Sequence, residues 1–160
     1  MPTSGSDPEE DRRETDQERA DRNFTELLQE LRVAQTGVQI LFAFLLTLPF
    51  TQRFELVSAV DRYIYLCTLL SAAAASAFLI APVSWHRILF QQGMKPVIVT
   101  TSDRLALVGL GFLVLAVSGA VFLIVDFVVG GPAAVLITAG QASLFIILWF
   151  ILPLRRRHQD

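Results

Sequence analysis

The sequence contains very few of the residues on which most catalytic and metal sites depend. It has one cysteine, Cys67, and only two histidines, which lie far apart in the chain. A single cysteine excludes a disulfide framework within the chain and a cysteine-rich metal motif, so we interpret Cys67 as a small packing residue. The sequence shows no paired carboxylates, histidine cluster or activated nucleophile, which general acid–base and nucleophilic catalysis require. We therefore predict that the protein is not an enzyme and that it binds no cofactor and no metal.

Charge is scarce in most of the chain after residue 32. The first 32 residues hold ten of the fifteen acidic and five of the thirteen basic side chains, whereas residues 33–154 are almost free of charge. The net charge of -2 is thus the average of two unlike regions. The acidic, polar start also lacks the short basic segment and immediate apolar core of a cleavable signal peptide. We expect the first apolar helix to stay in the protein as a membrane anchor.

The uncharged region divides into four stretches that are each long enough to cross a bilayer. About 20 apolar residues, at about 1.5 Å each, span roughly 30 Å of hydrocarbon. A soluble core helix has no need to be apolar on all sides. The predicted fold class is all-α: an integral membrane four-helix bundle with an amphipathic N-terminal helical extension. Within a membrane domain of residues 33–154, the predicted spans are 33–52, 63–85, 105–129 and 133–152.

Prolines, glycines and one serine predict where these helices begin and end. Pro49 with Arg53 is expected to end the first helix, and Pro82 with His86 and Arg87 the second. Ser102 is the expected N-cap of the third helix, and Pro153 with the three arginines after it is expected to end the fourth. Residues 130–132, Gly-Gly-Pro, predict a tight turn between the last two helices, because proline suits the first turn of a helix. Small residues are frequent at 71–77 and in the last two helices, which predicts closely packed helix backbones.

The segments outside the spans differ in composition. Residues 1–14 carry proline, glycine, serine and charge without apolar periodicity, so we predict disorder there. Residues 15–32 form a predicted amphipathic cytoplasmic helix, which either extends the first span or offers its apolar face to the membrane surface, another subunit or a cytoplasmic protein partner. Residues 155–160 form a basic tail. The helix at residues 15–32 is predicted because four apolar side chains recur there at helical spacing: Phe24, Leu27, Leu28 and Leu31.

The distribution of lysine and arginine predicts the orientation in the membrane. Eleven of the thirteen lie in the N-terminal segment, the loop at residues 86–104 or the C-terminus, and the other two loops hold only Arg53 and Arg62. Basic residues in short loops resist translocation. The prediction is a multi-pass protein of the cell (inner) membrane with both termini in the cytoplasm. Aromatic residues that favour membrane interfaces agree with this topology: Tyr63, Tyr65, Trp85 and Trp149.

Asp126 is the only ionisable residue between Arg104 and Arg155. A carboxylate within a span is a candidate for a proton or cation relay. At about 1.5 Å per residue from Leu105, however, it lies roughly 31 Å along the helix, at the outer boundary. There the amino end of the fourth helix favours a carboxylate, so a capping or interfacial role is the preferred interpretation.

Other polar residues within the spans are candidates for interhelical hydrogen bonds or an ion path. Gln35 and Gln39 form a polar stripe on the cytoplasmic half of the first helix. Gln141 and Ser118 lie near mid-membrane, where we expect a hydrogen-bonded layer that also includes Ser71 of the second helix. At the inner boundary, His86 is a candidate pH sensor or an interface anchor.

The stretch FTELLQELRVAQTGVQILFAFLLTLPF and the motif SWHRILF resemble a family of small, uncharacterised bacterial four-helix membrane proteins. The resemblance covers about residues 20–152. Some members carry an automatically assigned label of sodium:proton antiporter, but the resemblance supplies no established binding residues. Cation-proton exchange needs a carboxylate accessible from both sides, usually near mid-membrane, and this sequence has none there.

Two functional hypotheses follow. The first is a non-enzymatic membrane protein, expected to be a homo-oligomer, that acts through helix and subunit contacts as a scaffold or regulator. The alternative is a proton- or cation-linked transporter or channel, such as a sodium:proton antiporter. The lipid bilayer is the expected surrounding partner in both cases, and no feature indicates nucleic acid.

Overall fold

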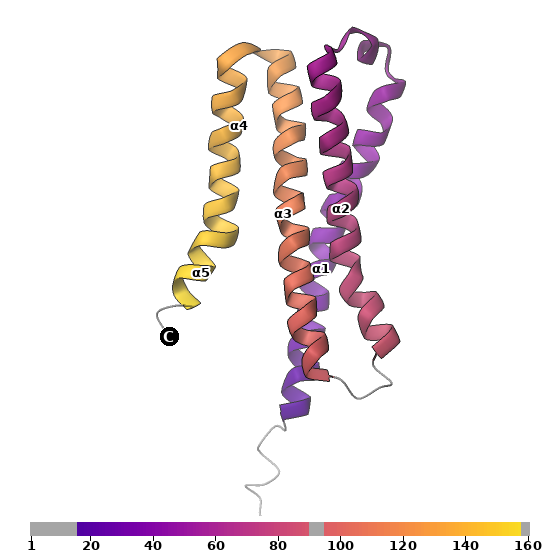
Figure 1. The fold of residues 1–160 in the computed structure, drawn as a ribbon, viewed down its shortest axis with the longest axis vertical. Helices are drawn as coiled ribbons and strands as arrows, with labels where there is room; N and C mark the ends of the chain where they lie inside the picture. Colours follow the sequence, from indigo (N-terminus) through magenta and orange to yellow (C-terminus); the bar gives the residue numbers. More distant parts are fainter. Residues whose placement is uncertain (1–15, 90–94, 158–160) are drawn as a thin grey trace, which may run out of the picture.

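A computed structural model describes residues 16–89 and 95–157, in which all regular structure is helical. Four long helices run up and down in one bundle, and both ends of the described chain lie at the same end of it (Figure 1). The α1–α2 connection contains two 3-10 turns, and the fourth helix changes pitch before its end. The elements are α1 Asp16–Thr47, η2 Leu48–Phe50, η3 Gln52–Leu56, α2 Ala59–Leu89, α3 Lys95–Val128, α4 Gly131–Ile146, η5 Ile147–Ile151 and α5 Leu152–Arg157.

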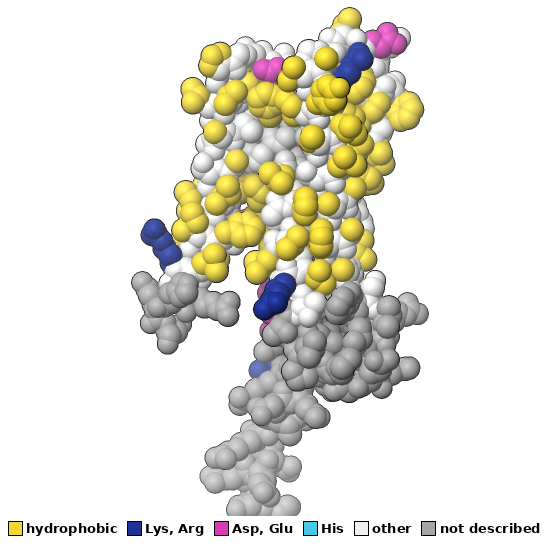
Figure 2. Space-filling model, in the orientation of Figure 1, with side chains coloured by type: hydrophobic (Ala, Val, Ile, Leu, Met, Phe, Trp, Pro, Cys, Tyr) yellow, Lys and Arg dark blue, Asp and Glu magenta, His cyan; other side chains and the backbone are white. Residues whose placement is uncertain are grey.

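The outer surface of the described bundle is apolar along its length. Figure 2 shows hydrophobic side chains over the middle of the helices and charged ones towards their ends. Large apolar side chains such as Ile40, Leu115 and Leu136 are exposed, which suits lipid as the solvent. Four segments are long and apolar enough to cross a membrane, namely Leu28–Phe50, Ala59–Ser84, Thr101–Val128 and Gly131–Arg156. The predicted fold class is confirmed.

The first helix has no break between its charged and apolar parts. α1 runs from Asp16 to Thr47, so the extension predicted at residues 15–32 and the first span are one helix. Leu31, at the end of the extension, is only 5% exposed and belongs to the same core cluster as Val38 and Leu79. The predicted disorder of residues 1–14 lies outside the described residues.

One helix end was predicted wrongly, and another lies close to its prediction. α2 continues past Pro82 and ends at Leu89, just after His86 and Arg87, and the Pro82 side chain is fully buried. α3 begins at Lys95, so Ser102 is a buried residue inside a helix instead of its N-cap. The hydropathy of the sequence marks where the membrane begins, whereas the helices continue beyond it. Within α2, tight packing compensates for the one hydrogen bond that Pro82 removes.

The fourth helix passes through Pro153 and ends at Arg157, the last of the three arginines predicted to end it, but Pro153 changes the helix before that end. The helix widens to a π-helical turn over Ile147–Ile151 and then continues as α5 to Arg157. In an α-helix, the Pro153 ring would press on the carbonyl of Trp149, four residues earlier. A wider turn at that carbonyl relieves this clash, as at other helix irregularities next to proline.

The hairpin between α3 and α4 is confirmed. Gly130 and Gly131 have φ angles of +70° and +62°, in the left-handed region that glycine adopts without strain. Pro132 lies in the first turn of α4, where its missing N–H has no helical partner to lose. The turn therefore depends on backbone conformations that other residues rarely adopt.

The core forms where α2 meets α3. A Cβ at Gly119 would lie 3.0 Å from the Cβ of Thr68, and one at Gly109 would lie 2.9 Å from two side-chain carbons of Leu79. Both glycines thus let the α2 and α3 backbones approach closely, as the abundance of small residues predicts. α1 packs across this pair and contributes Val38.

α4 is attached to the bundle through α3. Beyond isolated contacts, the only other long helix that α4 touches is α3. Figures 1 and 2 show the lower part of α4 diverging from the rest of the bundle. Trp149, stacked on Phe145 at a centroid distance of 5.0 Å, packs against the core cluster from this side. The described structure is therefore a compact unit of α1, α2 and α3 with α4 on one flank.

Candidate functional site

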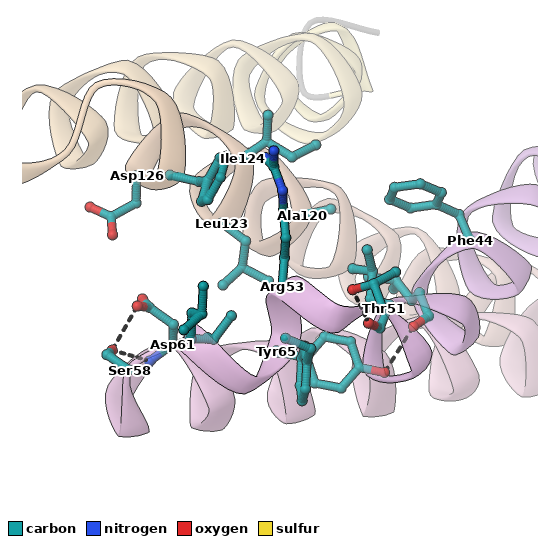
Figure 3. Close-up of a pocket in the computed structure, with 16 residues that line it drawn as sticks. Phe44, Thr51, Arg53, Ser58, Asp61, Tyr65, Ala120, Leu123, Ile124 and Asp126 are labelled. Carbon is teal, nitrogen blue, oxygen red and sulfur yellow. Dashed lines mark hydrogen bonds between the residues drawn. The ribbon is translucent and has the colours of Figure 1, made fainter.

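A cavity lies at the end of the described bundle where α1 turns into α2. Its volume is about 820 Å³, and sixteen residues of α1, η2, η3, α2 and α3 line it (Figure 3). Most of the lining is apolar, as with Phe44, Leu123 and Ile124. The size and the apolar walls are those of a ligand pocket. The charge pattern predicts that this end of the bundle faces outside.

The connection that frames the cavity follows from local chemistry. Pro49 lies in η2, and Thr51 then adopts an extended conformation before η3 begins. Ser58 precedes α2 and caps it: the Ser58 Oγ accepts the backbone N–H of Asp61 at 3.1 Å and donates to Asp61 Oδ2 at 2.6 Å. This cap fixes the start of α2 and places Asp61 in the cavity wall.

Tyr65 connects the cavity wall to the end of α1. Its hydroxyl donates to the backbone carbonyl of Leu45 at 2.8 Å, and its ring meets Phe54 edge-on at 5.1 Å. The helical donor for Leu45 would be the N–H of residue 49, which is proline and has none. The tyrosine therefore supplies the hydrogen bond that Pro49 cannot make.

Three charged side chains line the cavity without pairing with one another. Arg53 reaches from η3 towards α3, where its guanidinium lies 5.7 Å from the ring centre of Phe127 (Figure 3). Asp61 and Asp126 lie together on another side. Within residues 16–89 and 95–157, Asp126 forms no hydrogen bond or ion pair. The cavity thus combines one cation, held by a cation–π contact, with two carboxylates.

The placement of Asp126 is partly as expected. It lies two residues before the end of α3, hence at the end of a span, which agrees with the depth estimated from the sequence. The capping role was wrong, because Gly130 is the N-cap of α4 and no side chain caps that helix. The two glycines at +φ make the turn so tight that Asp126 remains on the α3 side of it.

Gln35 and Gln39 do not act as one stripe. Gln35 Nε2 donates to the carbonyl of Leu79 on α2 at 2.7 Å, which is the interhelical hydrogen bond that the sequence left as one alternative. Gln39 is exposed on the outer face of α1. Leu79 lies three residues before Pro82, whose ring disturbs the preceding turn. Gln35 therefore binds a carbonyl in a locally weakened part of α2.

The hydrogen-bonded layer expected at mid-membrane is not formed in the structure. Ser118 Oγ, Thr138 Oγ1 and both side-chain polar atoms of Gln141 are buried without a hydrogen-bond partner in the described chain. Ser118 and Gln141 lie at nearly equal distances along the chain from Gly130, so the hairpin places them at a similar height on α3 and α4. Ser71, on α2, is half-buried and does not connect to them.

Two further candidate sites can be described only in part. His86 lies on the last turns of α2, but its side chain is outside the described residues, as is the predicted pH-sensing role. Among the residues that the structure describes, no group of three or more His, Cys, Asp or Glu could hold a metal ion. Cys67 is exposed on α2, and the predicted packing role is therefore wrong for its position in the isolated chain.

Sequence reasoning missed the cavity and most of its charged lining. Arg53 was used only for the orientation and for the end of the first helix, and Asp61 was not considered. The pattern Ser58-x-x-Asp61 was a visible signal, because it is that of a capping box at the start of a helix. The role of Tyr65 had a weaker signal, since a proline four residues after Leu45 leaves that carbonyl without its donor.

No curated protein and no solved structure matches this sequence. A protein family, described as a family of unknown function and named DUF6328, matches residues 13–153. The match begins within the N-terminal segment and includes all four apolar helices and the cavity. This small membrane protein of four helices therefore belongs to DUF6328, a family of unknown function.

Proposed function

We propose that this protein is a non-enzymatic membrane protein that assembles through α4 and acts by its subunit contacts as a scaffold or regulator. The observation that carries the proposal is the position of α4, which packs on α3 and leaves its other faces without a helical neighbour in the described chain. The remaining helices already form a compact unit. A helix that adds little to the fold of one chain is well placed to join two chains.

The exposed side of α4 supports close helix contact. Ala139, Gly140 and Ser143 are exposed there, and a Cβ at Gly140 would meet nothing within 4 Å. Helices in lipid associate through van der Waals packing, which small residues improve by letting backbones approach. A second copy of α4 would fill the space over Gly140 and exclude lipid from it.

The oligomeric state tests this proposal. We expect the purified full-length chain to be a dimer or larger in mild detergent and in nanodiscs, and we expect Gly140→Leu to shift it towards the monomer. Gly37→Leu is the matched control, because Gly37 is also an exposed helical glycine with nothing within 4 Å. A monomeric wild-type chain, or equal effects of the two substitutions, would refute assembly through α4.

Disulfide crosslinking gives a second measurement. The chain has a single cysteine, Cys67, so Cys67→Ser provides a background without thiols. In that background, Ser143→Cys on the exposed side of α4 is expected to crosslink two copies in native membranes, and Thr36→Cys on the exposed side of α1 is not. Crosslinking at both positions to the same extent would indicate random collisions.

The exposed part of α1 before the membrane is the proposed contact for a cytoplasmic protein partner. Glu26, Gln29 and Glu30 are exposed on it, and the charge pattern predicts that this end is in the cytoplasm. Deletion of residues 1–30 is expected to abolish the cellular phenotype of the gene while Asp126→Asn has little effect. The reverse result would favour transport instead.

A proton- or cation-linked transporter, such as a sodium:proton antiporter, is the second candidate function. It is favoured by the buried polar atoms without partners in the described parts of α3 and α4, those of Ser102, Ser118, Thr138 and Gln141, because such groups in a membrane often belong to a path for ions or water. Liposomes containing the protein should then show flux under a proton or sodium gradient. Flux equal to that of empty liposomes, or unchanged by Asp126→Asn and Gln39→Leu, would exclude this function.

A further inference from the structure

We propose that the cavity between α1, α2 and α3 binds a phospholipid whose headgroup carries a primary amine, with Arg53 on the phosphate, Asp126 and Asp61 on the amine, and an acyl chain along the apolar wall. The cavity is built without α4, so this proposal is independent of assembly through that helix.

The arrangement of charge is the first argument. A guanidinium and two carboxylates line one cavity, yet no ion pair joins them in the described chain. Arg53 is instead held over Phe127, and Asp126 keeps its carboxylate without a partner. Opposite charges that share a cavity but stay apart can each receive the complementary charge of a zwitterion. An ammonium group donates hydrogen bonds to carboxylates, whereas a guanidinium matches the geometry of a phosphate.

The depth and lining of the cavity are the second argument. Asp126 and Asp61 lie at the ends of α3 and α2, where the apolar segments Thr101–Val128 and Ala59–Ser84 also end or begin. Lipid headgroups occupy this level, just outside the hydrocarbon. Below the charged residues, the wall is apolar and includes Leu45, Ala120 and Leu123. A volume of about 820 Å³ is within the range of small-molecule pockets.

The chemistry distinguishes between common phospholipids. Choline carries a quaternary nitrogen with no N–H to donate, and an anionic glycerol headgroup would face two carboxylates of like sign. Phosphatidylethanolamine alone among these three offers both a cationic N–H donor for Asp126 and a phosphate for Arg53, because the hydroxyl donors of the glycerol headgroup are uncharged. A charge-assisted hydrogen bond of this kind corresponds to about a tenfold change in affinity or more.

The test is binding of three phospholipids with identical acyl chains to the purified full-length protein in detergent, measured by native mass spectrometry. We expect phosphatidylethanolamine to bind about tenfold more tightly than phosphatidylcholine or phosphatidylglycerol. Asp126→Asn should abolish the preference for ethanolamine over choline, and Arg53→Gln should weaken both of these lipids. Equal binding of all three lipids to the wild-type chain would overturn the proposal.

Matched controls separate the cavity from surface charge. Glu55→Gln removes an acid from η3 at the same end of the bundle, but Glu55 does not line the cavity, and Arg155→Gln removes an exposed arginine at the other end. Both should leave the lipid preference unchanged. Asp126→Glu preserves the charge and should retain the preference, which guards against misfolding as the cause of any loss. If the preference survives in Asp126→Asn, or if Arg53→Gln leaves the affinity for both lipids unchanged, the lipid binds elsewhere and the proposal is wrong.

Discussion

Replacement of Gly119 by alanine should destabilise the bundle by crowding the contact between α3 and α2. The new Cβ would lie 3.0 Å from the Cβ and 3.1 Å from the Cγ2 of Thr68, and it would overlap the Thr68 Oγ1. Carbon atoms in good contact are about 3.5–4.0 Å apart, so the helices must separate or Thr68 must rotate. Rotation is costly, because a β-branched side chain is stiff and the Thr68 hydroxyl donates to the Ile64 carbonyl at 2.7 Å.

The expected magnitude is best taken relative to Gly111→Ala. Both glycines lie inside α3, but a Cβ at Gly111 would meet nothing within 4 Å. The helix-propensity gain of about 1 kcal/mol that alanine brings is the same at both positions, so it cancels in the comparison. What remains is overpacking, typically about 1–3 kcal/mol. Gly119→Ala should therefore be less stable than Gly111→Ala by about that amount.

Reversible unfolding of both variants in mixed detergent–SDS micelles, followed by circular dichroism, measures this difference. A double-mutant cycle with Thr68→Ala adds a check, because that change removes two of the three crowded atoms and should recover part of the lost stability. If Gly119→Ala is as stable as Gly111→Ala, or if its effect is unchanged by Thr68→Ala, then α2 and α3 are not in the close contact described.

Of three other predictions, two concern hydrogen bonds between helices and one concerns the π-helical turn. Tyr65→Phe should lower the unfolding free energy by about 1–2 kcal/mol in the same assay, because it leaves a buried carbonyl without a donor, whereas Tyr63→Phe at an exposed ring should have no effect. Gln35→Leu should cost about 0.5–2 kcal/mol through loss of its interhelical bond, and Gln39→Leu should be neutral; equal effects would contradict the assignment. Pro153→Ala should convert the π-helical turn to regular α-helix, which chemical shifts of residues 147–151 would report, and an unchanged turn would show that proline is not its cause.

The membrane spans could be predicted from the sequence because a helix in lipid must be apolar on every side over a fixed length. The start of the third helix, expected at Ser102, could not, since hydropathy records the limits of the membrane and this helix begins before them, at Lys95. Pro82 and Pro153 contributed to the predicted helix ends, but each lies inside its helix. Inside a membrane the alternative to a damaged helix is exposed backbone, which costs more. The helix therefore continues and adapts locally.

The candidate site shows the same division between local and tertiary information. The depth of Asp126 followed from a count along one helix and is consistent with the structure. Its surroundings depend on Arg53 of η3 and Asp61 of α2, which come close only because the α1–α2 connection folds over the end of α3. In the sequence, Arg53 and Asp61 do not differ from ordinary charged residues of a loop between two spans.

Two of the side chains that donate hydrogen bonds between helices serve carbonyls near prolines. Tyr65 donates to Leu45, whose helical donor would be Pro49, and Gln35 donates to Leu79, just before Pro82. In lipid, no water is present to satisfy the Leu45 carbonyl, so a neighbouring helix must. The Leu79 carbonyl keeps Val83 as its helical donor, but it lies next to the carbonyl of Phe78, which Pro82 leaves without one. This requirement explains why polar residues in this chain need not indicate a path for ions: Gln35 is occupied in holding α2, and Tyr65 in closing α1. The buried polar atoms that have no partner in the described chain are consequently those on which a test of transport should concentrate: the atoms of Ser76, Ser102, Ser118, Thr138 and Gln141.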